Sequence, residues 1–151
     1  MFNIKQSTDY RMIVAIITHP ALYKLTYGQE TRVEDFKLDT NKTYYLASKD
    51  NNPVGVFEVE PLTKITFQAH MALLPTIHGK GSRECVLDAL KHMKETTEYK
   101  KVFVPVPISS RYVIKVLKDL NFDLCGYMKQ AVIYNDKLTD LLLFDFDLSR
   151  L

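Results

Sequence analysis

The segment from Pro75 to Gly81 combines residue types that together could hold an anion. Glycine tolerates positive φ and lets a ligand approach the backbone, and Gly79 and Gly81 directly precede an apolar pattern typical of a helix. The first amides of a helix lack intrahelical acceptors and carry the positive end of the helix dipole. Lys80 and Arg83 add positive charge there. This combination favours a phosphate site, although two glycines before a helix are also typical of an ordinary turn.

Two common phosphate-binding loops are excluded by the same residues. A Walker loop ends in Gly-Lys-Ser/Thr, which does not occur in this chain. The Rossmann pattern Gly-x-Gly-x-x-Gly would need a glycine where Glu84 stands. Any nucleotide tail held at this turn is therefore held by another kind of loop.

Side chains that could move a proton occur in two expected strands. Glu58 and Glu60 share one face of a strand, a pattern more typical of a solvated face than of a catalytic one. His70 has an intrinsic pKa near 6.5 and could act as a base at neutral pH, but a histidine among alanine and methionine residues is more often a hydrogen-bonded packing residue. Glu58 and His70 are the candidates for proton transfer, with both structural alternatives open.

The cysteines and histidines do not indicate a metal site. Cys85 and Cys125 form no Cys-x-x-Cys pair and do not lie at zinc-ligand spacing from a histidine. No two histidines have metal-ligand spacing either, so the sequence predicts no metal. We expect both thiols to be buried, and a nucleophilic role for Cys85, early in an expected helix, would require a depressed pKa.

Composition places the chain among ordinary globular proteins. Its 151 residues are 46% hydrophobic and 25% charged, which predicts one domain over residues 1–151. The formal net charge of +2 does not support nucleic-acid binding. The longest apolar run, Met12 to Ile17, is six residues, against about twenty for a membrane span. No secretory signal pattern stands at the N-terminus, so we expect a cytoplasmic protein.

Hydrophobic periodicity predicts an alternation of strands and helices. Strands are expected at 2–5, 43–48, 54–60, 64–73, 102–106, 123–134 and 138–148, and helices after Ser7 or Thr8, over Pro20 to Tyr27, over 82–96 and after Ser109 or Ser110. Turn residues between 48 and 54 and at Asn135-Asp136 close two hairpins. The order predicts an α+β fold with a mostly antiparallel mixed sheet, one parallel crossover and about four helices.

With this order and this turn, the chain resembles the GCN5-related N-acetyltransferase superfamily over nearly its whole length. Pro75 to Gly81 is similar to the family's Pro-x-x-Arg-Gly-x-Gly segment, with Gly81 on the central glycine. Ser110 to Phe122 is similar to the family's fourth helix, whose closing Gly-Phe appears here as Asn121-Phe122. The resemblance implies acetyl-coenzyme A as cofactor and transfer of its acyl group to an amine. It also implies a set of residues around the pyrophosphate: Leu73, His78, Gly79, Lys80, Gly81, Ser82 and Arg83.

Three positions depart from the family pattern. His78 stands in place of Arg or Gln, and Arg83 stands in place of a small residue, where it either blocks the pyrophosphate or turns outward and pairs with a phosphate. The position of the family's acidic tyrosine falls on Leu117, and Tyr112 lies more than one turn earlier. These departures support an alternative, a non-catalytic protein of the same fold that acts in assembly, similar to phage head-assembly or virion components and located in the host cytoplasm or the virion. The sequence identifies neither an acceptor nor a protein partner.

Overall fold

The computed structural model describes residues 1–23 and 31–151 of the chain. Seven strands form one sheet in the order β1-β2-β3-β4-β5-β7-β6. The strands are β1 (Asn3–Gln6), β2 (Thr43–Lys49), β3 (Asn52–Pro61), β4 (Thr66–Leu73), β5 (Lys101–Pro107), β6 (Asp123–Tyr134) and β7 (Lys137–Asp147). Every neighbouring pair is antiparallel except β4 and β5, which confirms the expected mixed sheet with one parallel crossover.

The two hairpins form where turn residues separate aromatic and β-branched runs. Asp50 and Asn51 link β2 to β3 with positive φ of 52° and 66°, and Asn135 and Asp136 link β6 to β7 with 50° and 61°. Asn and Asp tolerate this conformation better than other residues with a side chain, and it matches the twist of the flanking strands. Both hairpins were predicted from these residues.

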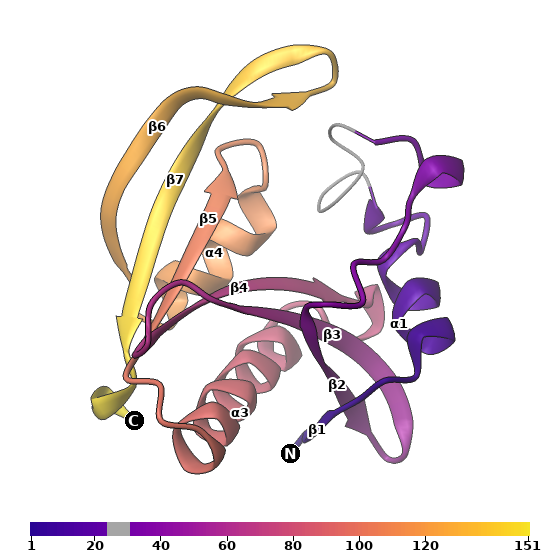
Figure 1. Ribbon diagram of the computed structural model, residues 1–151, viewed down its shortest axis with the longest axis vertical. Coiled ribbons are helices and arrows are strands. Elements are labelled where there is room, and N and C mark those ends of the chain that lie inside the picture. The colour runs from indigo at the N-terminus through magenta and orange to yellow at the C-terminus, as the bar shows by residue number, and fades with distance from the viewer. Residues whose placement is uncertain (24–30) are drawn as a thin grey trace.

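Helices cover both faces of the sheet (Figure 1). On one face, α1 (Tyr10–Ile17) packs Ile13, Ile16 and Ile17 into a cluster that also contains Tyr44 and Val56. On the other face, α3 (Lys80–Thr96) and α4 (Arg111–Asp119) pack with the opposite side chains of the strands. Short 3-10 turns occur at Val33–Asp35, Pro75–Ile77 and Leu148–Arg150.

The parallel pair β4 and β5 is the feature that positions the candidate site. Its register covers only Thr66↔Lys101, Phe67↔Val102 and Gln68↔Phe103. Beyond Gln68, β4 stays paired with β3 through Leu73, while β5 stays paired with β7 through Pro107. The two strands therefore part in the middle of the sheet, and the sheet opens toward the start of α3 on one side and of α4 on the other (Figure 1).

Some local expectations are corrected by the structure. The side chain that caps α1 is Asp9, whose Oδ1 accepts from the Met12 amide, rather than Ser7 or Thr8; Ser7 instead accepts from the Asp9 amide. Cys125 is exposed, because β6 is the edge strand of the sheet. The expected helix over Pro20 to Tyr27 extends into residues 24–30, outside the described part. In the described part, no helix is long and apolar enough to span a bilayer.

Candidate functional site

The gap between β4 and β5 is the first part of the site. Ala69, His70 and Met71 line it on the β4 side, and residues 104–107 line it on the β5 side. Backbone groups on the facing edges of these two strands have no strand partner across the gap. An extended ligand with amide groups could therefore hydrogen-bond to either strand edge.

The turn at the end of β4 is the second part. Leu73 ends the strand, residues 75–77 form a 3-10 turn, and Gly79 precedes α3 with φ of 85° and ψ of −129°. A Cβ on Gly79 would have no heavy atom within 4 Å, so the space in front of the turn is open. Within the described residues, the amides of Gly79, Lys80 and Gly81 donate to no backbone acceptor. An open turn whose three amides donate to no backbone acceptor, at the start of a helix, fits a phosphate group.

The side chain of His78 is held against the protein. Its Nε2–H donates to the Leu73 carbonyl at 3.0 Å, and its ring stacks on Tyr112 with centroids 4.1 Å apart. Ser82 Oγ donates to the Ile77 carbonyl at 3.0 Å, so the Tyr112 hydroxyl is the donor in the hydrogen bond between Tyr112 and Ser82. Burial raises the pKa of Tyr112, which keeps this phenol protonated at neutral pH.

Arg83 points toward α4 rather than toward the turn. Its Nη1 lies 3.1 Å from Asp119 Oδ2, and Lys115 shares that carboxylate at 3.4 Å. Lys80 is largely exposed and lies 3.8 Å from Glu84. Since the cationic side chains at the start of α3 face carboxylates, a candidate anion site at this turn would consist mainly of backbone amides.

Glu58 lies on the opposite face of the sheet and is buried, which corrects the expectation of a solvated strand face. Its side chain accepts from the Tyr44 hydroxyl at 3.4 Å and lies 3.7 Å from Lys42 Nζ. Only 9% of Glu58 is exposed, because the segment before β2 covers it, whereas Glu60 remains exposed, as expected. Burial and the charge of Glu58 raise the pKa of Tyr44, so that phenol stays a donor.

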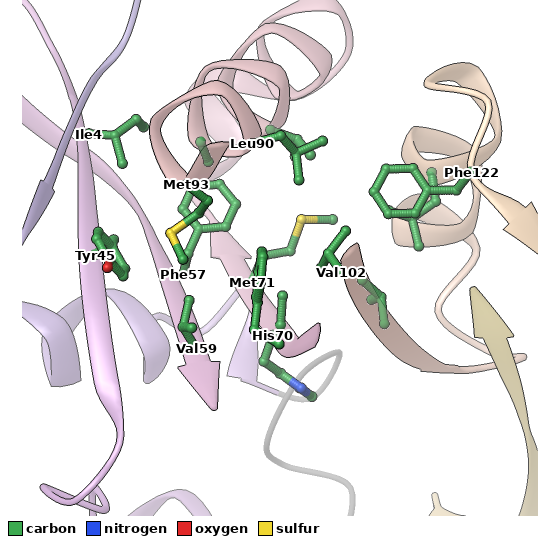
Figure 2. A pocket seen from close by; sticks show the side chains of 16 residues that line it. Ile4, Tyr45, Phe57, Val59, His70, Met71, Leu90, Met93, Val102 and Phe122 are labelled. Carbon is green, nitrogen blue, oxygen red and sulfur yellow. The ribbon is translucent and has the colours of Figure 1, made fainter. Parts of the chain in front are cut away.

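His70 is the register partner of Glu58 in the neighbouring strand. Figure 2 shows its imidazole pointing away from α3, whereas Met71 lies on the α3 side. Because β4 forms one wall of the gap, His70 stands between the gap and Glu58. The two candidates for proton transfer therefore lie side by side on one face of adjacent strands.

A pocket of about 370 Å³ adjoins Glu58 on this face. Its charged lining residues are Asp35, Lys37, Asp39, Lys42 and Glu58, three acidic and two basic. Phe36 also lines it and packs edge-to-face on Tyr23 with centroids 5.7 Å apart.

Comparison with solved structures gives matches over nearly the whole chain. Spermidine N-acetyltransferase from Vibrio cholerae in complex with CoA and spermine matches with a TM-score of 0.79 at 13% identity, over 98% of this chain and 96% of that chain. A chimera of Vibrio cholerae SpeG and hSSAT matches with a TM-score of 0.80 at 14% identity, over 99% of this chain and 96% of the chimera. An N-acetyltransferase from Staphylococcus aureus Mu50 matches with a TM-score of 0.70 at 14% identity, over 98% of this chain and 99% of that chain. No family model matches the chain.

The protein has the GCN5-related N-acetyltransferase fold. The fold predicted from element order and from the segment Pro75 to Gly81 is thereby confirmed. The comparisons lend no support to the expected likeness to phage proteins.

Within this fold, three sequence-predicted positions have an internal role. Leu117 is 2% exposed and belongs to the core beneath α3. A Cβ on Gly81 would meet Ile77 at 3.3 Å, so this glycine faces the protein interior and not the open turn. Cys85 is buried, and burial raises the pKa of its thiol to about 12, which excludes a thiolate nucleophile at neutral pH.

Sequence reasoning missed the partners that fix the site. Tyr112, Asp119 and Tyr44 contact candidate residues that are 30, 36 and 14 positions away in the chain. No local spacing indicates such pairs, because each depends on how α3, α4 and β2 are placed by the sheet. Only the position of Tyr112 in the first turn of α4 offered a signal.

Proposed function

We propose that this protein is an acyl-coenzyme A-dependent N-acyltransferase that acts on an amine. The observation that carries the proposal is the parting of β4 and β5 after Gln68, which leads directly to the free amides of Gly79, Lys80 and Gly81. A strand gap suits an extended amide-containing arm, and an amide cradle at its end suits a pyrophosphate. Coenzyme A has both an extended amide-containing arm and a pyrophosphate.

The residues around the turn divide into two roles. The backbone of residues 79–81 would hold the pyrophosphate, and Ser82 and His78 would fix the turn through their bonds to the Ile77 and Leu73 carbonyls. Arg83, paired with Asp119, would act through the position of α4 or release that partner to reach a phosphate. Acetyl-coenzyme A is the donor implied by the resemblance.

A bound thioester would supply an activated acyl carbon: the nitrogen would bond to it, the carbon–sulfur bond would break with its electron pair going to sulfur, and the sulfur would take one proton from nitrogen. An acceptor that arrives as an ammonium ion must also give one proton to a base before it attacks. The chain offers two groups for that proton, the His70 imidazole beside the gap and the Glu58 carboxylate one strand further. Free backbone amides along the gap would donate to the developing oxyanion. His70 is the better-placed base, and Glu58 is better placed to attract a charged amine.

The acceptor we propose is a cationic amine that enters through the pocket beside Glu58. The charged residues that line this pocket have a net formal charge of −1. Because the Glu58 carboxylate is buried, the low dielectric around it strengthens its attraction to an ammonium group. A structural neighbour holds CoA and spermine, so polyamines are the first acceptors to test.

One specific observation favours the alternative of a non-catalytic protein. The Tyr112 ring reaches from the first turn of α4 to Ser82 and His78 near the start of α3, and so links the starts of the two helices that follow β4 and β5. With Leu117 in the core, no tyrosine of α4 is free to act as a general acid. A protein that uses this fold only for binding a partner would show these same features.

Titration calorimetry with coenzyme A and acetyl-coenzyme A separates the two functions. Micromolar binding, followed by release of free thiol in the presence of spermine or spermidine, is the expected result. The thiol assay uses a Cys125→Ser background, since exposed Cys125 would react with the thiol reagent. No binding of either nucleotide at millimolar concentration overturns the proposal and leaves the non-catalytic function.

The acceptor pocket is tested with two matched variants. Glu58→Gln keeps the shape of the side chain but removes its charge, and a hydrogen bond to a charged group contributes about 1.5–3 kcal/mol. KM for a polyamine should therefore rise at least about tenfold, with the Kd for coenzyme A unchanged. Glu60→Gln is the control, because Glu60 contacts the same Lys42 at 3.6 Å but is exposed. Equal effects of the two variants would contradict a specific role for Glu58.

A further inference from the structure

A second cavity lies beneath the sheet on the α3 side (Figure 2). Its volume is about 50 Å³. Strands β1 to β5 form its floor, and α3, Leu117 of α4 and Phe122 form its roof. Ala89, Leu90 and Met93 contribute the α3 side. The cavity is a gap in the packing of the main core, a region that is normally close-packed.

The cavity adjoins the gap between β4 and β5. Ala69, His70, Met71 and Val104 line both the gap and the cavity. These four are among the first residues after the last register pair of β4 with β5, Gln68↔Phe103. A chain that enters the gap from the turn at Gly79 therefore reaches the cavity where the two strands meet.

The lining selects an apolar occupant. Almost all side chains around the cavity are aliphatic, aromatic or thioether groups, such as Ile4, Phe57 and Met71. The imidazole of His70 points to the other face of the sheet (Figure 2). Water in such a cavity would lack the two to four polar partners that a buried water needs, so the cavity favours hydrocarbon over solvent.

We infer that this cavity receives the hydrocarbon tail of the donor, and that the protein prefers thioesters with acyl groups longer than acetyl. The inference rests on the proposed function and adds the donor class to it. A cavity needs about 10–15 Å³ to hold one water-sized group. The cavity therefore takes about four methyl or methylene groups, which corresponds to butyryl through hexanoyl donors. The bonds made and broken are those of acetyl transfer, since only the tail of the acyl group differs.

Titration of the wild-type protein with coenzyme A and with its acetyl, butyryl, hexanoyl and dodecanoyl thioesters tests the inference. Burying each methylene should tighten Kd by about fourfold. Butyryl-coenzyme A should therefore bind about 15-fold more tightly than acetyl-coenzyme A. Dodecanoyl-coenzyme A should bind no more tightly than hexanoyl-coenzyme A, because its tail is longer than the cavity can hold.

Two substitutions in the cavity provide the specific readout. Ala89→Leu fills the cavity from α3 and should abolish the gain from butyryl and hexanoyl groups, with the Kd of coenzyme A unchanged. Val86→Ala, one turn earlier in α3, enlarges the cavity and should move the preference toward longer chains. Ala15→Leu, the same substitution at an exposed position of α1, is the control. It should change neither the Kd of coenzyme A nor the preference for longer acyl groups.

The outcomes separate this inference from the proposed function. If coenzyme A binds and all thioesters bind equally, the cavity is only a packing defect and the inference is overturned while the proposed function stands. If Ala89→Leu unfolds the protein, the shift in Val86→Ala decides the question. If coenzyme A itself does not bind, both the proposed function and the donor preference are wrong.

Discussion

Gly79→Ala is the most direct perturbation of the anion cradle, because Gly79 has a backbone conformation that other residues avoid. Its φ of 85° and ψ of −129° fall where only glycine is comfortable. Holding alanine there costs on the order of 1–3 kcal/mol. For a chain of this length about 1 kcal/mol lowers Tm by about 2–4 °C, so we expect a Tm decrease of about 2–12 °C.

The effect on ligand binding should exceed the effect on stability. The new methyl group would stand in the open space in front of the turn, where no heavy atom beyond its two chain neighbours lies within 4 Å. It would keep a phosphate away from the neighbouring amides, each of which contributes about 1.5–3 kcal/mol as a hydrogen bond to a charged group. Loss of one such bond raises Kd for coenzyme A by at least about tenfold, measured by calorimetry well below the lowered Tm.

Gly81→Ala is the matched control, two residues away on the same helix start. Its φ lies in the ordinary helical range, and its Cβ would point inward at Ile77, 3.3 Å away. Gain of helix propensity and loss of space roughly offset, so Tm should change by only a few degrees and Kd by less than about threefold. If Gly79→Ala binds coenzyme A as tightly as the wild type, or if Gly81→Ala alone loses binding, the turn amides do not form the phosphate site.

Three further changes have definite expected outcomes. Tyr112→Phe removes the hydrogen bond to Ser82, which contributes about 0.5–1.5 kcal/mol. If that bond closes the gap, the variant should bind coenzyme A up to about tenfold more tightly in calorimetry. Weaker binding would instead make Tyr112 part of the site. Gly55→Ala should lower the free energy of unfolding by about 1–3 kcal/mol in urea titrations, because the new Cβ would lie 2.6 Å from Leu73 Cδ2; an unchanged midpoint would show that Leu73 can move aside. The thiol of Cys85 has its pKa raised from 9.0 to about 12 by burial, so its contribution to stability is complete below pH 9 and is lost as the pH rises toward 12. Between pH 8 and 10.5 the wild type should therefore lose about 2 kcal/mol relative to Cys85→Ala in urea titrations, and parallel curves would contradict a buried thiol.

The fold was predictable because its signals are local. The hairpin of β2 and β3 follows from asparagine and aspartate between two β-branched runs, and α3 follows from an apolar stripe at spacings of three and four. Each signal lies within one element or one turn. The order of those elements then limited the topology to a mixed sheet, as the structure confirms.

The burial of Glu58 could not be predicted in the same way. Strand alternation correctly placed Glu58 and Glu60 on one face, but it cannot say which part of that face another segment covers. Residues 31–42 cover Glu58 and leave Glu60 exposed, and they have little regular structure of their own. Long irregular segments carry no periodic signal, so where they pack is known only from the three-dimensional structure.

The departures at His78 and Arg83 weigh less against the proposed function than the sequence alone indicates. The family pattern is stated in side chains, but the groups that face the open turn are the amides of residues 79–81. Those amides depend on the conformation of Gly79 and on the turn that His78 fixes through the Leu73 carbonyl. The gap depends on the register of β4 with β5, which stops at Gln68 because each strand continues with a different neighbour. On the proposed function, a substitution that leaves this backbone in place should therefore leave coenzyme A binding in place.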